Sequence, residues 1–298
     1  FGFGFYLSGV HWIVNALTFD EGFKVLIPFA LILIPLFLSI FFSSFTVLLG
    51  PFLNLDFKSI LIFSGGLAFS DYLRAKILTG FPWNIWAYSF SWANEILQIL
   101  GIFGFFSFNL IVVTLFTLPV IIFFKFNLTK RFLYLTSIPL ILFILYIYGN
   151  YSINKNSMLL NSIEQKIKVK VISPNFKLEY GLTDKEIEVR LMKLIRYSEP
   201  MQNQKAIFIW PEGAFSGYSY NQLKYFKNIF KENFSKNHLI LFGVNKLDPQ
   251  TGKYFNSLVI VNNYFEIIRE YKKQKLVPFG EFLPMEKFFY KLGLKKIT

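Results

Sequence analysis

The sequence predicts a membrane α-helical bundle, residues 1–150, followed by an α/β domain, residues 151–298. One observation is composition: 54% of the 298 residues are hydrophobic, whereas a soluble domain is roughly 45–50% apolar. The other observation is charge. Residues 1–150 carry 7 Lys/Arg and 5 Asp/Glu, but residues 151–298 carry 24 and 13. The two halves therefore suit different solvents.

The first half contains about five apolar segments that approach or exceed the roughly 20 residues of a membrane helix. They are residues 1–19, 23–49, 59–73, 96–124 and 132–148. The first is interpreted as the remainder of a truncated helix. A cleavable signal is disfavoured because several such segments follow one another. The polar residues 151–166 are expected to be a linker or the entry to the second domain.

Residues 71–92 combine one acidic residue, two basic residues and an aromatic loop. Asp71 and Arg74 are three residues apart, so on one helical face they can neutralise each other. Residues 79–92 have no charge, three Trp and one Tyr, and these residue types favour the membrane interface. The loop is either an aromatic anchor for the bundle or a lipid-facing rim beside an active site. Residue chemistry alone favours the anchor.

The charges orient the bundle only weakly. The loop 125–131 has three basic residues and no acid, so it favours the cytoplasm. One further crossing, through residues 132–148, then places the second half outside the cytoplasm. Among the other basic residues of the first half, Lys58 agrees with this orientation and the rest oppose it.

The second half alternates β-rich runs with helical patterns, which is typical of a layered α/β domain. The predicted strands are residues 167–173, 206–210, 239–244, 257–261 and 265–271. A capping box formed by Thr183 and Glu186 begins a helix with an apolar face. A second helix with an apolar stripe is predicted over residues 221–234.

Composition also excludes or disfavours several kinds of chemistry. The chain has no cysteine, so it forms no disulfide and no thiolate metal site. Its two histidines are far apart, so a histidine-based metal site is not expected either. The lysines of residues 151–298 are mixed with acids and lack the stripe of a nucleic-acid-binding surface. They fit a solvated surface or a face toward anionic lipid headgroups.

Two charged residues stand where catalysis could use them. Glu212 directly follows an apolar strand, where low polarity would raise its pKa and suit a general base. An ordinary loop glutamate is the simpler alternative. Lys273 stands in a lysine-rich run that enters a Pro/Gly turn and then reaches Glu281. A buried Lys paired with a Glu can hold positive charge beside a reaction centre, although such runs are usually solvated.

Several short motifs follow one another along nearly the whole chain. They are F-G at 3–4, G-V-H-W at 9–12, D-Y-L-R at 71–74, T-G-F-P-W at 79–83, P-N at 174–175, W-P-E at 210–212, F-N-S at 255–257 and Y-x-K-x-x-L-V-P-F-G-E-F-x-P at 271–284. The last is long and specific, whereas the early glycine and aromatic matches are individually weak. In this order, the motifs resemble those of the apolipoprotein N-acyltransferase family.

That resemblance implies a nitrilase-like αββα sandwich for the second domain, incomplete at its C-terminus. It implies that Glu212 is the general base, that Lys273 stabilises the oxyanion and that Glu281 supports Lys273. The family's nucleophilic cysteine should follow Lys273, beyond the last residue of this chain. We therefore interpret the chain as a fragment truncated at both ends, and we expect this fragment itself to be inactive.

The resemblance also indicates where substrate binds. The substrate-binding candidates are Phe81, Pro82, Trp83, Tyr180 and Asn256. Tyr180 is included because the stretch after residues 174–175 departs from the family's usual Gln and Lys-Trp pattern. The loop that meets substrate there is therefore expected to differ.

The implied reaction moves a fatty acyl chain from a phospholipid to the N-terminal amine of a diacylglyceryl-cysteine lipoprotein, through a thioester acyl-enzyme. The implied location is the bacterial inner membrane, multi-pass, with the catalytic domain on the periplasmic side. No cofactor is implied. Three alternatives stay open: a membrane-tethered amidase for a small amide, a non-enzymatic membrane protein, and a transporter, which polar mid-helix residues would favour.

Overall fold

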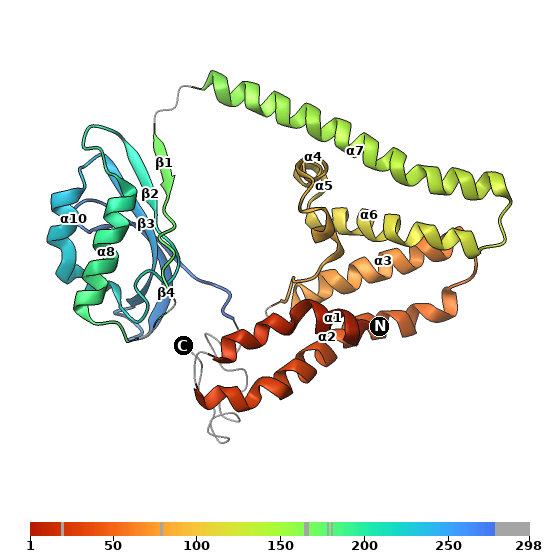
Figure 1. Ribbon diagram of the computed structural model, residues 1–298, viewed down its shortest axis with the longest axis horizontal. Coiled ribbons are helices and arrows are strands. Elements are labelled where there is room, and N and C mark those ends of the chain that lie inside the picture. Colours follow the sequence, from red (N-terminus) through yellow and green to blue (C-terminus); the bar gives the residue numbers. More distant parts are fainter. Residues whose placement is uncertain (19–20, 78–79, 164–166, 178, 180, 278–298) are drawn as a thin grey trace. The chain divides into compact units, whose positions relative to one another are not determined.

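The computed structural model describes residues 1–298 except 19–20, 78–79, 164–166, 178, 180 and 278–298. The chain divides after Ser162 into a helical unit and an α/β unit that begins at Ile163 and ends at Leu276 (Figure 1). Each unit has its own buried core, so each is described separately.

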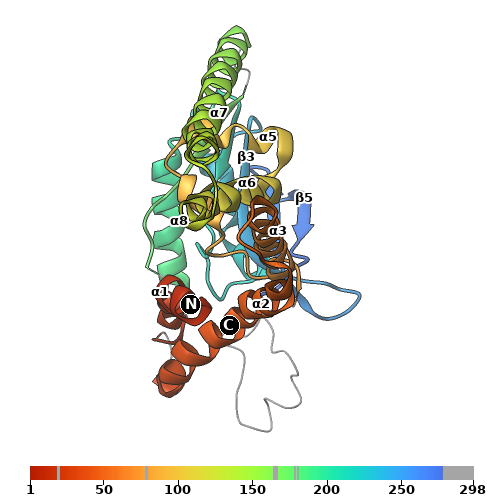
Figure 2. The ribbon, with the colours of Figure 1, turned by 90° about the vertical axis from the view of Figure 1, so that its right-hand side faces the viewer.

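The helical unit is a series of helices of very different lengths. They are α1 (Gly2–Val10), η1 (His11–Thr18), η2 (Glu21–Leu26), α2 (Ile27–Leu49), η3 (Gly50–Phe52), α3 (Phe57–Arg74), η5 (Trp86–Phe90), α4 (Asn94–Leu97), α5 (Leu100–Phe103), α6 (Phe105–Thr117), η6 (Leu118–Phe123) and α7 (Leu128–Ser162). Helix α1 packs against α2, and α2 packs against α3 (Figures 1 and 2). Small clusters of buried apolar side chains hold the helices together.

Within the described residues, three helical stretches are long and apolar enough to cross a membrane. They are Glu21–Phe52, Phe105–Phe123 and Leu128–Ser162. Only 17%, 39% and 11% of the residues in their most apolar windows are buried in the protein itself. Exposed apolar helices of this length fit a surface that faces lipid. A membrane helical region is therefore confirmed, although the number of qualifying spans is lower than the sequence predicted.

The predicted single span over residues 96–124 is wrong, because the structure breaks it at Gly104. This glycine has φ 74° and ψ 172°, a backbone conformation that does not continue a helix and that glycine adopts readily. Helix α5 ends just before the break, and α6 begins just after it. The remaining stretch Phe105–Phe123 has 19 residues, which is still enough for a crossing.

The predicted linker over residues 151–166 is also wrong for most of its length. Helix α7 continues to Ser162 and has 35 residues. Asn and Lys alone do not end a helix, and the sequence has neither Pro nor Gly between Tyr151 and Ser162. At 1.5 Å per residue the helix is about 52 Å long. That length exceeds the roughly 30 Å hydrocarbon core of a bilayer. The polar C-terminal part of α7 is therefore not needed to cross the bilayer.

The α/β unit contains one five-stranded mixed sheet with helices. Its elements are β1 (Lys168–Val171), α8 (Asp184–Ser198), β2 (Ala206–Ile209), α9 (Tyr220–Leu223), η7 (Lys224–Phe226), α10 (Lys227–Asn233), β3 (His238–Leu247), β4 (Tyr254–Val261) and β5 (Ile267–Lys272). The strand order is β1-β2-β3-β4-β5. Strands β1 to β3 are parallel, whereas β4 is antiparallel to both of its neighbours. All five predicted strands are confirmed.

The helices of this unit form where the sequence predicts, with one difference. Thr183 and Glu186 make both bonds of the capping box that begins α8. The predicted helix over residues 221–234 is instead divided into α9, η7 and α10. Its apolar stripe still faces the core, since Leu223 and Phe230 are buried.

The two faces of the sheet differ in what covers them. One face packs against α8 and α10, with Phe208, Ile240 and Phe242 almost fully buried. On the other face, Val171 and Leu258 are exposed although they are apolar. Because strand side chains alternate between faces, both residues belong to the second face, and the described residues leave their apolar side chains uncovered.

Candidate functional site

The sheet topology brings three of the predicted residues to one edge. Strand β5 is antiparallel to β4, and β4 is antiparallel to β3, so β5 runs in the same direction as β2 and β3. The residues that follow β2 and β5 therefore lie at the same edge of the sheet as the start of β4. Glu212 follows β2, Lys273 follows β5, and Asn256 lies near the start of β4. Neighbouring strands are about 4.8 Å apart, so β2 and β5 are roughly 14 Å apart along the sheet.

Glu212 lies in a loop that β3 holds at both ends. Before it, the Trp210 backbone N–H donates to the Leu241 carbonyl at 2.9 Å. The buried Trp210 ring also donates through Nε1 to Ser198 Oγ at 3.1 Å. After it, Ser219 forms a β-bridge with Asn245. The loop thus crosses from β2 toward β3, which carries it toward the strands that hold Asn256 and Lys273.

The Glu212 side chain is exposed. The sequence predicts that an apolar setting desolvates this carboxylate, and the described residues do not provide that setting. The physical reason is that Glu212 stands at an open sheet edge, two residues beyond the buried Trp210. Desolvation would require a further segment to cover the edge.

Lys273 and Asn256 are direct neighbours. The Lys273 backbone N–H donates to the Asn256 carbonyl at 2.9 Å, one position beyond the end of β5. Both side chains are half-buried. In the sheet, Asn256 is paired with Asn245 of β3, the residue that bridges to the Glu212 loop. Backbone contacts therefore link the three predicted residues through β3 and β4.

A charged cluster that the sequence did not predict lies beside these residues. Glu270 forms an ion pair with Lys246 and accepts a hydrogen bond from Ser257 Oγ at 3.0 Å. Burial alone would raise the pKa of Glu270, but the hydrogen bonds from Lys246 and Ser257, with nearby lysine charge, hold that pKa below its usual range. Only the spacing of paired strands could have revealed this cluster, because its members come from three strands.

The lysines at the end of β5 and just after it make different contacts. Lys272 pairs with Asp248 at 3.4 Å, and its ammonium lies 4.6 Å from the centre of the Phe255 ring. Lys272 therefore has partners within the sheet, and Lys273 is the neighbour that contacts Asn256. Among the described residues, no group of three or more His, Cys, Asp or Glu could hold a metal ion.

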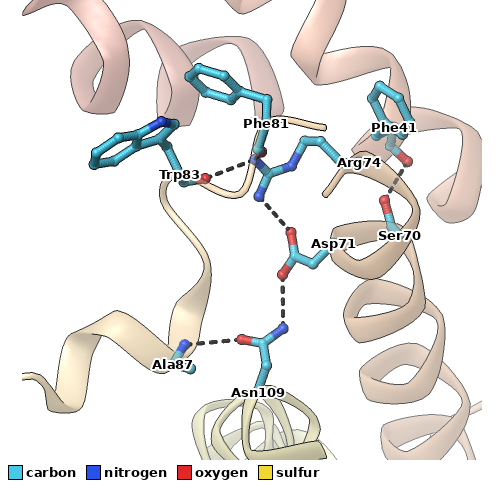
Figure 3. A network of polar contacts seen from close by, with 8 residues as sticks. All are labelled: Phe41, Ser70, Asp71, Arg74, Phe81, Trp83, Ala87 and Asn109. Carbon is cyan, nitrogen blue, oxygen red and sulfur yellow. Dashed lines mark hydrogen bonds and ion pairs between the residues drawn. The ribbon is translucent and has the colours of Figure 1, made fainter. Parts of the chain in front are cut away.

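In the helical unit, Arg74 and Asp71 form the ion pair that the sequence predicts. Arg74 Nη2 donates to Asp71 Oδ1 at 3.0 Å, and both side chains are almost fully buried. Arg74 Nη1 donates to the carbonyls of Phe81 and Trp83, at 2.5 Å and 2.7 Å (Figure 3). One guanidinium thus joins the end of α3 to the aromatic loop.

Asn109 of α6 completes this network, and the sequence did not predict its role. Its Nδ2 donates to Asp71 Oδ2 at 3.0 Å, and its Oδ1 accepts from the Ala87 backbone N–H at 2.9 Å (Figure 3). Asn109 is fully buried. A lone amide within an uncharged apolar run was the available signal, because polar groups in such runs need partners. We refer to Asp71, Arg74 and Asn109 as the buried network.

The predicted substrate-binding residues of the aromatic loop are only partly exposed. Phe81 is half-buried and packs against the cluster that contains Tyr6 and Val10. Trp83 is 52% exposed, and its ring meets Trp12 edge to face at 5.4 Å. Pro82 is exposed. The two other predicted residues, Tyr180 and Glu281, lie outside the residues that the structure describes.

The helices and the sheet together define a membrane-bound protein with an α/β domain. Residues 1–118 match the sequence model of the apolipoprotein N-acyltransferase N-terminal domain. An apolipoprotein N-acyltransferase of Rickettsia typhi is 31% identical and aligns with 100% of this chain and 59% of its own length. Those of Rickettsia prowazekii and Brucella melitensis are 30% and 26% identical, again over 100% of this chain and over 59% and 57% of theirs.

The chain is therefore a relative of the apolipoprotein N-acyltransferases, and the resemblance predicted from its motifs is confirmed. It spans 59% of the length of the Rickettsia typhi protein. A solved structure of an N-terminal amidase matches 40% of this chain with 20% identity and a TM-score of 0.26. That likeness is too low to establish the nitrilase-like fold.

Proposed function

We propose that the full-length protein transfers a fatty acyl chain from a phospholipid to the N-terminal amine of a diacylglyceryl lipoprotein. The main support is that the whole chain aligns with apolipoprotein N-acyltransferases. The sheet adds a second support, because Glu212, Asn256 and Lys273 follow or begin strands at one edge. A carboxylate and an ammonium at one edge can serve as base and oxyanion partner.

In the proposed mechanism, a cysteine thiol is the nucleophile. The printed chain has no cysteine, so we assign this residue to the part of the relatives' length that the chain does not span. Glu212 accepts the thiol proton, and the thiolate attacks the ester carbonyl of the phospholipid. Lys273 stabilises the oxyanion. The C–O bond then breaks, and protonated Glu212 returns its proton to the leaving lysophospholipid oxygen.

The second half of the reaction regenerates the thiol. The α-amine of the lipoprotein attacks the thioester, and Glu212 accepts a proton from that amine. The C–S bond breaks, the amide is formed, and the proton returns to the thiolate sulfur. In this proposal Glu281 orients Lys273, and Tyr180 lies near the acceptor. No cofactor takes part. In this proposal the catalytic domain acts on the periplasmic side of the inner membrane, as the family resemblance implies.

We also propose that a second sheet covers the exposed apolar face, which gives the nitrilase-like αββα sandwich. Val171 and Leu258 are apolar and exposed on that face, and an uncovered apolar sheet surface calls for a partner layer. If the layer is present in the full-length protein, Leu258→Ala removes a buried side chain and lowers the free energy of unfolding by about 2–5 kcal/mol. An unchanged denaturation midpoint for the Leu258→Ala variant would contradict the proposal of a second sheet.

The function is tested with purified full-length protein, a phospholipid donor and a synthetic diacylglyceryl lipopeptide. We expect an N-acylated lipopeptide by mass spectrometry. Lys273→Ala should lower the rate by about 10²–10³-fold, the usual effect of removing one oxyanion partner. The exposed neighbour Lys275→Ala is the matched control and should retain the wild-type rate. Hydrolysis of a small amide without lipopeptide acylation would instead favour an amidase.

A further inference from the structure

The buried network connects mainly to backbone groups of the aromatic loop. Two carbonyls, those of Phe81 and Trp83, accept from Arg74, and the Ala87 N–H donates to Asn109. Residues 81–85 have no regular secondary structure, so their polar backbone groups lack helical partners. In apolar surroundings such groups must be satisfied by side chains. The network therefore supplies the partners that fix this backbone.

Other contacts restrict the same loop. Gly80 has φ 85°, and a Cβ there would lie 2.2 Å from the Ala75 carbonyl oxygen. Asn84 also has positive φ, at 55°. Its side chain packs directly on Gly9 of α1, where a Cβ would lie 1.5 Å from Asn84 Nδ2. The two left-handed residues and these close contacts restrict the conformations that the loop can adopt.

The side chains that this loop exposes at its surface are aromatic and uncharged. Trp83 is 52% exposed and Trp12, against which it packs, is 42% exposed. Farther along, Trp92 is 78% exposed. Tryptophan combines a large apolar ring with one polar N–H, so such rings favour the boundary between lipid tails and headgroups.

We propose that Arg74 is a positioning residue that, with Asp71 and Asn109, fixes the aromatic loop as a preformed platform for phospholipid acyl chains. This inference rests on the proposed function, since it supplies the platform to the acyl-transfer reaction. Arg74 is too deeply buried to meet substrate itself. It acts through the carbonyls of Phe81 and Trp83, and thereby through the Trp83 ring. A platform that is set before substrate arrives lowers the entropy cost of binding.

A purely structural role for the network is the alternative. Buried ion pairs stabilise some helical bundles, and losing one partner then weakens the whole bundle. Two observations favour positioning. Arg74 donates to two loop carbonyls but to one carboxylate, and Asn109 donates to Asp71 but accepts from the loop. Three of these bonds join the network to residues 81–87, and two join the network residues to each other.

The test uses full-length protein in nanodiscs whose phospholipids carry bromine on the acyl chains. For the fluorescence samples every other tryptophan of the full-length protein, including Trp12, Trp86, Trp92 and Trp210, is replaced by Phe, so that fluorescence reports Trp83 alone. Acyl transfer is measured with all of these tryptophans in place. Arg74→Lys keeps the charge beside Asp71 but loses the planar fork that reaches two carbonyls. We expect acyl transfer to fall by about a hundredfold, Trp83 anisotropy to fall, and bromine quenching of Trp83 to decrease, with the circular dichroism of the protein unchanged.

Two further variants keep the test decisive. Lys24→Gln is the matched control, because Lys24 and Glu21 form an ion pair of the same spacing that is exposed; it should leave rate and quenching unchanged. If Arg74→Lys fails to fold, Asn109→Ala replaces it, since that change leaves the ion pair and frees the Ala87 N–H. For a folded variant, wild-type quenching or a wild-type rate overturns the proposal. If the wild-type protein transfers no acyl chain, the proposed function fails, and unchanged anisotropy in the variants would separately reject the positioning role.

Discussion

The helical unit and the α/β unit hold their candidate functional residues in opposite ways. Arg74 and Asp71 are almost fully buried and bonded to defined partners. Glu212, in contrast, is exposed at a sheet edge, and Lys273 is half-buried. Charges within apolar helices are paired, and Arg74 and Asp71 find each other within the helical unit. A sheet edge becomes a catalytic site only when other segments cover it, as the proposed second sheet would.

The largest expected effect concerns Glu212, the exposed candidate residue of the α/β unit. Glu212→Gln in the full-length protein removes the proposed general base and keeps the side-chain shape. We expect the rate of lipopeptide acylation to fall by about 10²–10⁴-fold. The matched control is Glu232→Gln, an exposed glutamate on α10, which should leave the rate unchanged. Equal rates for both variants would show that Glu212 remains an ordinary loop glutamate.

The next largest effect concerns the buried Asp71–Arg74 pair of the helical unit. Asp71→Asn removes the charge that balances Arg74 and leaves a buried cation without its counter-ion. We expect the free energy of unfolding to fall by about 3–5 kcal/mol, measured by denaturation of the full-length protein in detergent micelles. Glu21→Gln breaks the exposed pair with Lys24 and should have little effect. Similar small losses for both variants would contradict the distinction between the two environments.

A smaller effect is expected at the start of α8. Thr183→Ala removes the side-chain oxygen that accepts from the Glu186 backbone N–H. Loss of such a cap costs about 1 kcal/mol, and hydrogen exchange of the α8 amides should report it locally. Thr183→Ser retains the oxygen and is the control.

The smallest effect is a pH dependence of the α/β unit. The pKa of Glu270 is lowered in the folded protein by the bonds from Lys246 and Ser257. A lowered folded pKa means that this stabilisation is present above the unfolded pKa and is lost as pH falls through the folded pKa. Unfolding midpoints between neutral and acid pH should therefore drop less steeply for Glu270→Gln than for wild type. Parallel curves would show that the ion pair does not contribute.

Local features of both units were predictable from the sequence, and distant ones were not. The Asp71–Arg74 pair and the Thr183–Glu186 capping box join residues three apart, a spacing that a helix brings together. The Glu270–Lys246 pair joins different strands, and its register depends on the whole sheet. The division at Gly104 was missed because hydropathy measures how apolar a segment is and does not report backbone angles.

The same contrast applies to the candidate site. The motifs indicated Glu212, Asn256 and Lys273, and the order of strands places these residues at one edge. Their exposure could not be read from the motifs, because burial depends on which segments pack over that edge. Asn109 was visible as a polar residue in an apolar run, but its two partners come from elsewhere in the chain.

The central claim is that the full-length protein forms a thioester acyl-enzyme with the help of Glu212 and Lys273. The direct measurement is the intact mass of that protein after incubation with phospholipid and without acceptor. We predict a mass increase of one acyl chain that neutral hydroxylamine removes and that Lys273→Ala fails to accumulate. Acylation of the lipopeptide at full rate by a protein that never carries the adduct would contradict the account.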